Sequence, residues 1–103
     1  MKKKTKKISL GKDKHVIVRG PQGGEVTRAQ DMQNFIDENI KDMEEHANKV
    51  EEVNYKTLSW CVVEHNLDLD DKELWIYLKE LDALLVRKIQ DGIEELTRGD
   101  AGS

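Results

Sequence analysis

The sequence predicts a mostly α (α+β) fold, in which an N-terminal β-hairpin is followed by about three helices. Two observations carry this prediction. Residues 8–19 alternate apolar with polar side chains and are rich in β-branched residues, as strands are. After residue 27, apolar residues recur every three or four positions, which is the spacing of one helix face. The chain has 103 residues, enough for a single domain, which we place at residues 8–98.

The hairpin is expected over residues 8–19, with a turn at residues 11–14 (Gly-Lys-Asp-Lys). Residues 1–7 contain five lysines, and we expect them to be disordered and basic. Residues 20–26 hold the only proline and three of the seven glycines, a composition that predicts a loop between the hairpin and the first helix.

The first helix is expected at about residues 28–52. Thr27 followed by Gln30 fits a capping box, in which two side chains satisfy free backbone N–H groups. The apolar positions of this segment form a narrow stripe: Met32, Ile36, Ile40, Met43, Ala47 and Val50. Phe35 flanks the stripe. Because the stripe is thin, this helix should depend on packing against the rest of the protein.

A second helix is expected at about residues 54–66, the most apolar stretch of the chain, which should be central to the core. The third is expected at about residues 71–97. Asp70 and Glu73 form the capping signature at its start, and Gly99 is expected to end it. Residues 99–103 would then be a flexible tail.

The third helix has one apolar stripe and several apolar residues outside it. The stripe contains Leu74, Tyr77, Leu78, Leu81, Leu84, Leu85, Ile89, Ile93 and Leu96. Trp75, Ile76 and Val86 lie off the stripe, which indicates a second contact surface. Either these three residues, followed by Phe35 and Met43, contact a protein partner, or they pack within the fold.

Charge is distributed unevenly along the chain. The net charge is −4, but residues 1–19 carry +7 and residues 20–103 carry −11. A basic segment joined to an acidic body indicates an electrostatic partner for one or both ends. Nucleic acid is the obvious candidate for the basic end. However, no aromatic residues are interleaved with the lysines, and the acidic remainder would repel phosphate, so nucleic acid is not the favoured partner.

Little in the sequence indicates catalysis or metal binding. Cys61 and His65 are four residues apart and would share one helix face, but two ligands do not complete a metal site. Residues 66–71 alternate oxygen-bearing side chains as a calcium loop does, yet the required glycine and glutamate are missing. Phosphate-loop and nucleophile-elbow motifs are also missing. We expect a non-enzymatic protein without cofactor or metal.

The location of the protein also follows from its composition. A single cysteine cannot form an intrachain disulfide, and no apolar run approaches the roughly 20 residues that cross a bilayer. The basic N-terminus lacks the apolar segment of a secretory signal. We therefore expect a soluble, cytoplasmic protein that does not bind membranes.

The order of these segments resembles the tail assembly chaperones of long-tailed bacteriophages. The resemblance covers about residues 8–97 and rests on residue-class patterns in three regions. The first is the hairpin Ile8-Ser9-Leu10-Gly11-Lys12 with Val16-Ile17-Val18-Arg19. The second is the segment from Lys56 to Leu74, in which an acid-x-x-leucine pattern beginning at Asp71 marks the start of the next helix. The third is the group of leucines Leu78, Leu81 and Leu85 around Asp82. The acidic first helix and the short interhelical segment depart from the family pattern.

The resemblance implies a non-enzymatic assembly factor. Such chaperones bind the long helical tape measure protein, keep it soluble and help to recruit tail tube subunits. They act in the host cell cytoplasm and are absent from the mature virion. The partners that the resemblance implies are thus the tape measure and tail tube proteins.

Two other classes of function stay open. One is a small helical regulatory or adaptor module that binds another protein, and it predicts a stable dimer or complex formed through the stripe at residues 32–50. The other is a nucleic-acid-binding module, which predicts salt-sensitive binding through Lys2–Lys7. The sequence also leaves open a homo-oligomer.

Overall fold

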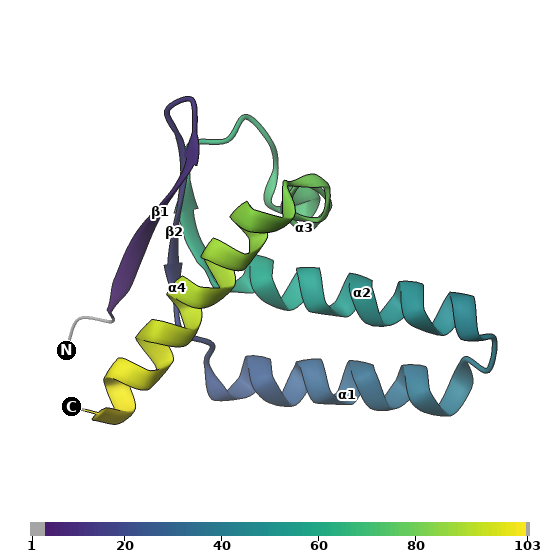
Figure 1. Cartoon of the computed structure of the whole chain (residues 1–103). Helices are drawn as coiled ribbons and strands as arrows, with labels where there is room; N and C mark the ends of the chain where they lie inside the picture. The colour runs from purple at the N-terminus through teal and green to yellow at the C-terminus, as the bar shows by residue number, and fades with distance from the viewer. Residues whose placement is uncertain (1–3, 103) are drawn as a thin grey trace.

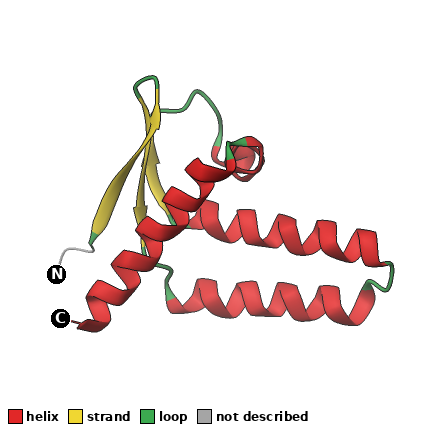
Figure 2. Ribbon diagram, viewed as in Figure 1, coloured by secondary structure: helices red, strands yellow, loops and turns green. Residues whose placement is uncertain are grey.

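The computed structural model describes residues 4–102, without the side chains of residues 98–102, and confirms a mostly helical α+β fold (Figures 1 and 2). Its elements in chain order are β1 (Thr5–Gly11), β2 (Lys14–Arg19), α1 (Gly23–Asn39), α2 (Met43–Trp60), β3 (Val62–His65), α3 (Asp71–Glu80) and α4 (Ala83–Gly102). The three strands form one antiparallel sheet in the order β1-β2-β3.

The predicted hairpin is confirmed and is longer than expected. Lys12 and Asp13 occupy its two-residue turn with φ angles of 50° and 64°, and this left-handed geometry matches the twist of the flanking strands. Gly11 precedes them with φ 87°, beside a register shift between Ser9 and Gly11. Glycine adopts this φ without steric cost, which explains the glycine at the end of β1.

The core lies between one face of the sheet and helices α2, α3 and α4. Its buried members are Ile8, Leu10, Val16, Val18, Leu58, Leu67, Leu74, Leu78, Val86 and Ile89. The strands contribute every second residue, because alternate side chains of a strand point to the same face. Helix α4 crosses the face formed by β1 and β2 (Figure 1).

Helices α1 and α2 form an antiparallel hairpin that projects away from the sheet, here called the helical arm (residues 23–60) (Figure 1). Helix α1 packs mainly against α2, and Ile36 is its one buried residue. The radius of gyration is 14.5 Å, above the roughly 13 Å of a compact chain of this length. The excess fits an arm that stands clear of the core.

The prediction of one helix at residues 28–52 was wrong. The chain leaves helical geometry at Ile40, and Asp42 begins a new helix by accepting a hydrogen bond from the Glu45 backbone N–H at 2.9 Å. The first helix also begins before Thr27. Glu25 accepts from the backbone N–H of Gln22 at 3.0 Å, so the capping signature is Gln22 with Glu25.

The prediction of a helix at residues 54–66 was also wrong in its second half. Helix α2 ends at Trp60, and residues Val62–His65 form β3, which pairs with β2. The pairing is extended at both ends by hydrogen bonds from Arg19 N to Cys61 O at 2.8 Å and from His15 N to Asn66 Oδ1 at 2.8 Å. The β-branched Val62 and Val63 favour this strand.

The third predicted helix starts where expected, with Asp70 as N-cap, but it divides into two. Leu81 is extended with ψ 156°, and Asp82 accepts from the Leu84 backbone N–H at 2.9 Å, so that α4 starts in a new direction. Helix α4 continues to Gly102, so Gly99 does not end it and residues 99–102 are not a tail. Residues 5–7, expected to be disordered, belong to β1, while residues 1–3 and 103 lie outside the described residues.

Candidate functional site

The residues predicted to contact a partner fall in different environments. Phe35 and Met43 lie on the helical arm with 64% and 87% of their surface exposed. Ile76 lies on α3 and is 42% exposed. Trp75, also on α3, is half-buried, and the Lys56 ammonium lies 5.3 Å from the centre of its ring. The arm therefore presents the two most exposed of the five residues.

For Val86 the structure shows the second alternative, packing within the fold, because this residue is buried in the core and is only 7% exposed. The break at Leu81 turns α4 in a new direction, and Val86 and Ile89 pack in the core against the sheet. Leu84, which was expected on the buried stripe, is instead 78% exposed. Asp82, a residue type that caps helix starts, was the one local signal that could have revealed the break.

An apolar groove runs between α1 and α2 on one side of the helical arm. It encloses about 390 Å³, and its apolar lining residues are Met32, Phe35, Ile36, Ile40 and Val53. Ile36 and Val53 form its buried floor, Met32 and Ile40 are half-buried, and Phe35 stands exposed at its edge. The sequence identified most of these positions as an apolar stripe but did not indicate which would stay open.

Charged side chains border this groove. Arg28 and Asp31 lie on the α1 side, and Lys49 and Glu52 lie on the α2 side, so the lining itself is balanced. The wider surroundings are not balanced, since the helical arm (residues 23–60) contains nine acidic and four basic residues, a net charge of −5 with His46 neutral. The groove thus lies in a strongly acidic part of the molecule.

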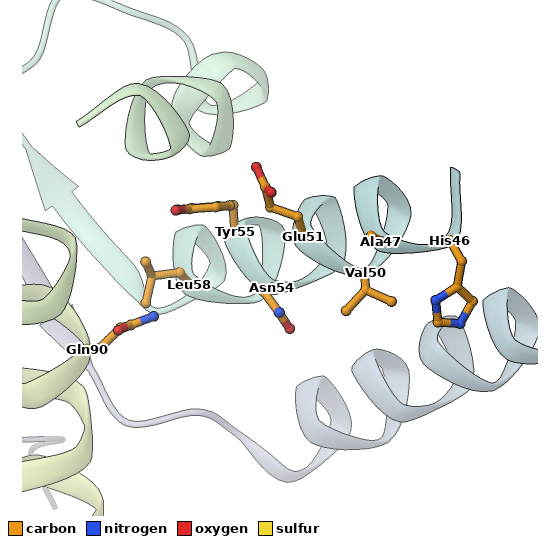
Figure 3. A pocket seen from close by; sticks show the side chains of 8 residues that line it. All are labelled: His46, Ala47, Val50, Glu51, Asn54, Tyr55, Leu58 and Gln90. Carbon is orange, nitrogen blue, oxygen red and sulfur yellow. The ribbon is translucent and has the colours of Figure 1, made fainter. Parts of the chain in front are cut away.

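A second hollow lies along α2, on a different part of its surface (Figure 3). It encloses about 570 Å³ and is lined by His46, Ala47, Val50, Glu51, Asn54, Tyr55, Leu58 and Gln90. In Figure 3, His46, Val50 and Asn54 extend to the side of α2 nearer α1, whereas Glu51 and Tyr55 extend to the side nearer α3. Asn54, Leu58 and Gln90 also line a neighbouring hollow of about 560 Å³ between the arm and α4.

The base of the helical arm is held by Arg19. Its guanidinium donates to both oxygens of the Glu25 carboxylate, at 2.8 and 2.7 Å, and to the backbone carbonyl oxygens of Gly20 and Trp60. The hydrogen bond with Glu25 raises the pKa of Arg19, so the guanidinium stays charged. In addition, the Arg28 guanidinium lies 4.7 Å from the centre of the Trp60 ring. These contacts fix where the arm leaves the sheet.

The tip of the arm carries a second polar link between its helices. His46 Nε2 lies 2.8 Å from Asp37 Oδ1, and Gln33 donates to the same carboxylate oxygen at 3.1 Å. The hydrogen bond with His46 and then that with Gln33 lower the pKa of Asp37. The two helices are therefore joined at both ends of the arm.

Cys61 and His65 do not share a helix face, because Cys61 caps the end of α2 and His65 lies in β3. Cys61 is buried, and this burial raises the pKa of its thiol. The Nδ1 atom of His65 accepts from the Leu67 backbone N–H at 3.1 Å. Among the side chains that the structure describes, those of residues 4–97, no three His, Cys, Asp or Glu residues are grouped as a metal site would require.

The basic N-terminal segment is only partly described. Lys6, in β1, pairs with Glu95 of α4 and so contributes to the packing of that helix on the sheet. Lys2 and Lys3 lie outside the described residues. The expectation that Lys2–Lys7 could bind nucleic acid therefore stays a prediction.

No helix in the described part of the chain is long and apolar enough to cross a membrane. Comparison of the chain with protein-family models, with curated proteins and with solved structures finds no match.

Proposed function

We propose that this chain is a non-enzymatic bacteriophage tail assembly chaperone, which binds the helical tape measure protein and helps to recruit tail tube subunits. The observation that carries the proposal is the helical arm, whose apolar side chains remain open to solvent far from the core. The resemblance of residues 8–97 to that family supplies the identity of the client.

The architecture of the arm suits transient binding to a client. The core is complete without α1, since none of its members comes from that helix. Phe35 and Met43 can therefore contact another protein without any loss of core packing. Methionine is flexible and polarisable, so Met43 can adapt to client segments of different shape. Weak, adaptable contacts would allow tail tube subunits to displace the chaperone when they polymerise.

The same proposal places the protein in the host cell cytoplasm during assembly and excludes it from the mature virion. An assembly factor that is displaced by the polymerising tube leaves no copy behind. The whole arm, rather than a catalytic centre, is then the functional part of the molecule.

The test is co-expression of the chain with the products of its neighbouring genes, among which the proposal expects a tape measure protein and tail tube subunits. We expect the tape measure protein to be recovered in the soluble fraction only when this chain is present, and to co-purify with it. Recovery that does not depend on this chain would contradict the proposal.

Two other outcomes would identify the alternatives. A tight homodimer without a client would indicate a regulatory or adaptor module. Salt-sensitive retention of nucleic acid that disappears when residues 2–7 are deleted would indicate a nucleic-acid-binding module. Light scattering after size-exclusion chromatography at low and high salt separates these cases.

A further inference from the structure

We propose that the groove between α1 and α2 is a docking site for a basic amphipathic helix of a partner protein. This inference rests on the proposed function as a client-binding protein and goes further, because it assigns the binding surface and the chemistry of the bound segment.

The shape of the groove fits a helix. Its α1 wall is formed by residues at positions 28, 31, 32, 35, 36 and 40, which recur at helical spacing over about three turns. Its floor is formed by the buried residues Ile36 and Val53, and Phe35 is its exposed apolar residue. A partner helix with apolar residues at i, i+3, i+4 and i+7 would present a matching stripe to these side chains.

Phe35 is the expected anchor of this contact. Its side chain is 64% exposed although it borders an apolar surface, so a docked helix would remove a large apolar area from water. Aromatic residues of this kind contribute much of the binding energy at protein interfaces. Ile36, by contrast, is already buried and serves the arm itself.

The charge of the helical arm distinguishes a basic helix from the other possible occupants of the groove, which are a second copy of this chain, an acidic helix and nucleic acid. The helical arm carries a net charge of −5, and those of its charges that lie within one Debye length of about 8 Å from the groove act on a docked helix with little screening. A second copy would bring the same acidic surface to the contact, and nucleic acid or an acidic helix would be repelled as well. A helix with lysine or arginine beside its apolar stripe is instead attracted by the negative charge of the arm.

Asp31 provides a negative charge in the lining of the groove itself. It lies on the α1 wall of the groove, is exposed, and forms no ion pair within the described residues. A cation on the docked helix can therefore pair with it without breaking an existing contact.

The experiment uses the full chain and a fluorescently labelled synthetic helix of about 18 residues, with leucines along one face and lysines on the other. Two matched peptides serve as controls: one has glutamate in place of every lysine, and one has the same composition in scrambled order. Binding is followed by anisotropy, and backbone NMR shifts of the labelled protein locate the peptide.

We expect the lysine peptide to bind, with shifts centred on residues 28–40 and 49–53, and the two control peptides to bind at least about tenfold more weakly. Phe35→Ser should weaken binding about tenfold. Asp31→Lys should weaken it about fivefold, an effect that shrinks at high salt. Leu84→Ser, which removes an even more exposed apolar side chain from α4, should change it less than about twofold.

Equal binding of the lysine and glutamate peptides would overturn the assignment of a basic partner. Binding that survives Phe35→Ser unchanged would overturn the assignment of the groove. A dimer that dissociates on Phe35→Ser, with no peptide bound, would show a second copy as the occupant and also overturn the proposal. Circular dichroism checks that each variant keeps its fold.

Co-expression of the Phe35→Ser chain with the tape measure protein separates this inference from the proposed function. If the client stays soluble with this variant, the chaperone function stands and the groove is not its site. If the lysine peptide binds the groove but the unsubstituted chain does not solubilise the client, the groove assignment stands and the chaperone function falls.

Discussion

The guanidinium of Arg19 and the carboxylate of Glu25 form a two-point ion pair, with nitrogen–oxygen distances of 2.8 and 2.7 Å, at the base of the helical arm. The side chains are only 14% and 22% exposed. Because Arg19 also donates to the Trp60 carbonyl oxygen, one side chain joins the end of β2 to the start of α1 and the end of α2. The pair thus connects the sheet to both helices of the arm.

Replacing Glu25 with alanine should lower the free energy of unfolding by about 2 kcal/mol, since it leaves a mostly buried guanidinium without its anion. The matched control is Glu95→Ala, which removes the exposed pair with Lys6 and should cost no more than about 0.5 kcal/mol. Urea denaturation of both variants measures the difference. Equal losses would mean that burial does not strengthen the pair at the base of the arm.

Glycines at two helical positions should respond oppositely to alanine. At Gly92 an added Cβ would lie 2.6 Å from Cδ1 of the buried Ile8, so Gly92→Ala should cost about 1 kcal/mol even though alanine favours helices. At Gly24, in the first turn of α1, an added Cβ meets nothing within 4 Å, and Gly24→Ala should stabilise by about 0.5 kcal/mol. Thermal unfolding checks both signs. Stabilisation by Gly92→Ala would show that α4 can move away from β1 at little cost.

The parts of the fold that the sequence predicted are those with local signals. Alternating β-branched residues and the Gly-Lys-Asp-Lys turn predicted the hairpin, and Asp70 predicted the start of α3. The missed breaks at Ile40 and Leu81 have a common cause. In both places the apolar spacing continues in phase across the break, and it concealed the helix-starting residues Asp42 and Asp82.

Strand β3 and the open groove could not be predicted from local sequence. A four-residue strand is stabilised by pairing with β2, more than 40 residues earlier in the chain, and Val62 fits an apolar helix face equally well. The stripe at residues 32–50 contains Met32, Ile36 and Ile40 of the groove lining, but their exposure depends on the reversal of the chain between α1 and α2. Phe35 and Met43 were expected to contact a partner, and their exposure is compatible with that prediction.

The link between His46 and Asp37 should make the tip of the arm sensitive to acid. Because the pKa of Asp37 is lowered in the folded state, the ionised carboxylate contributes stability above the ordinary value of 3.8. This contribution is lost as the pH falls below 3.8 and through the folded-state pKa. His46→Ala should raise the pKa of Asp37 toward the ordinary value, as measured by NMR titration of the side-chain carboxyl carbon.

Lys41→Ala is the control for this titration, since it removes a charge from the segment that joins α1 to α2 and leaves the hydrogen bond between His46 and Asp37 intact. It should shift the pKa of Asp37 less than His46→Ala does. An unchanged pKa in the His46 variant would mean that Gln33 alone holds the carboxylate in its ionised form.

Ile36 should govern the local stability of the arm rather than that of the core. It is 5% exposed and is the one buried residue of α1, so truncation to alanine removes the only fully buried apolar side chain that this helix contributes to its packing on α2. We expect Ile36→Ala to lower the opening free energy of the α1 backbone amides by about 2 kcal/mol in hydrogen exchange. Amides of Val16, Val18 and Leu78 should keep their protection, because the core contains no residue of α1.

Val26→Ala is the matched control for this exchange measurement, since it truncates a side chain of the same helix that is 55% exposed. It should change the exchange of α1 by less than about 0.5 kcal/mol. A uniform loss of protection across the sheet and α3 in Ile36→Ala would contradict independent opening, because it would mean that arm and core unfold as one unit. Selective loss in α1 would instead show that the helix bearing Phe35 can adjust or open while the sheet and its covering helices stay folded.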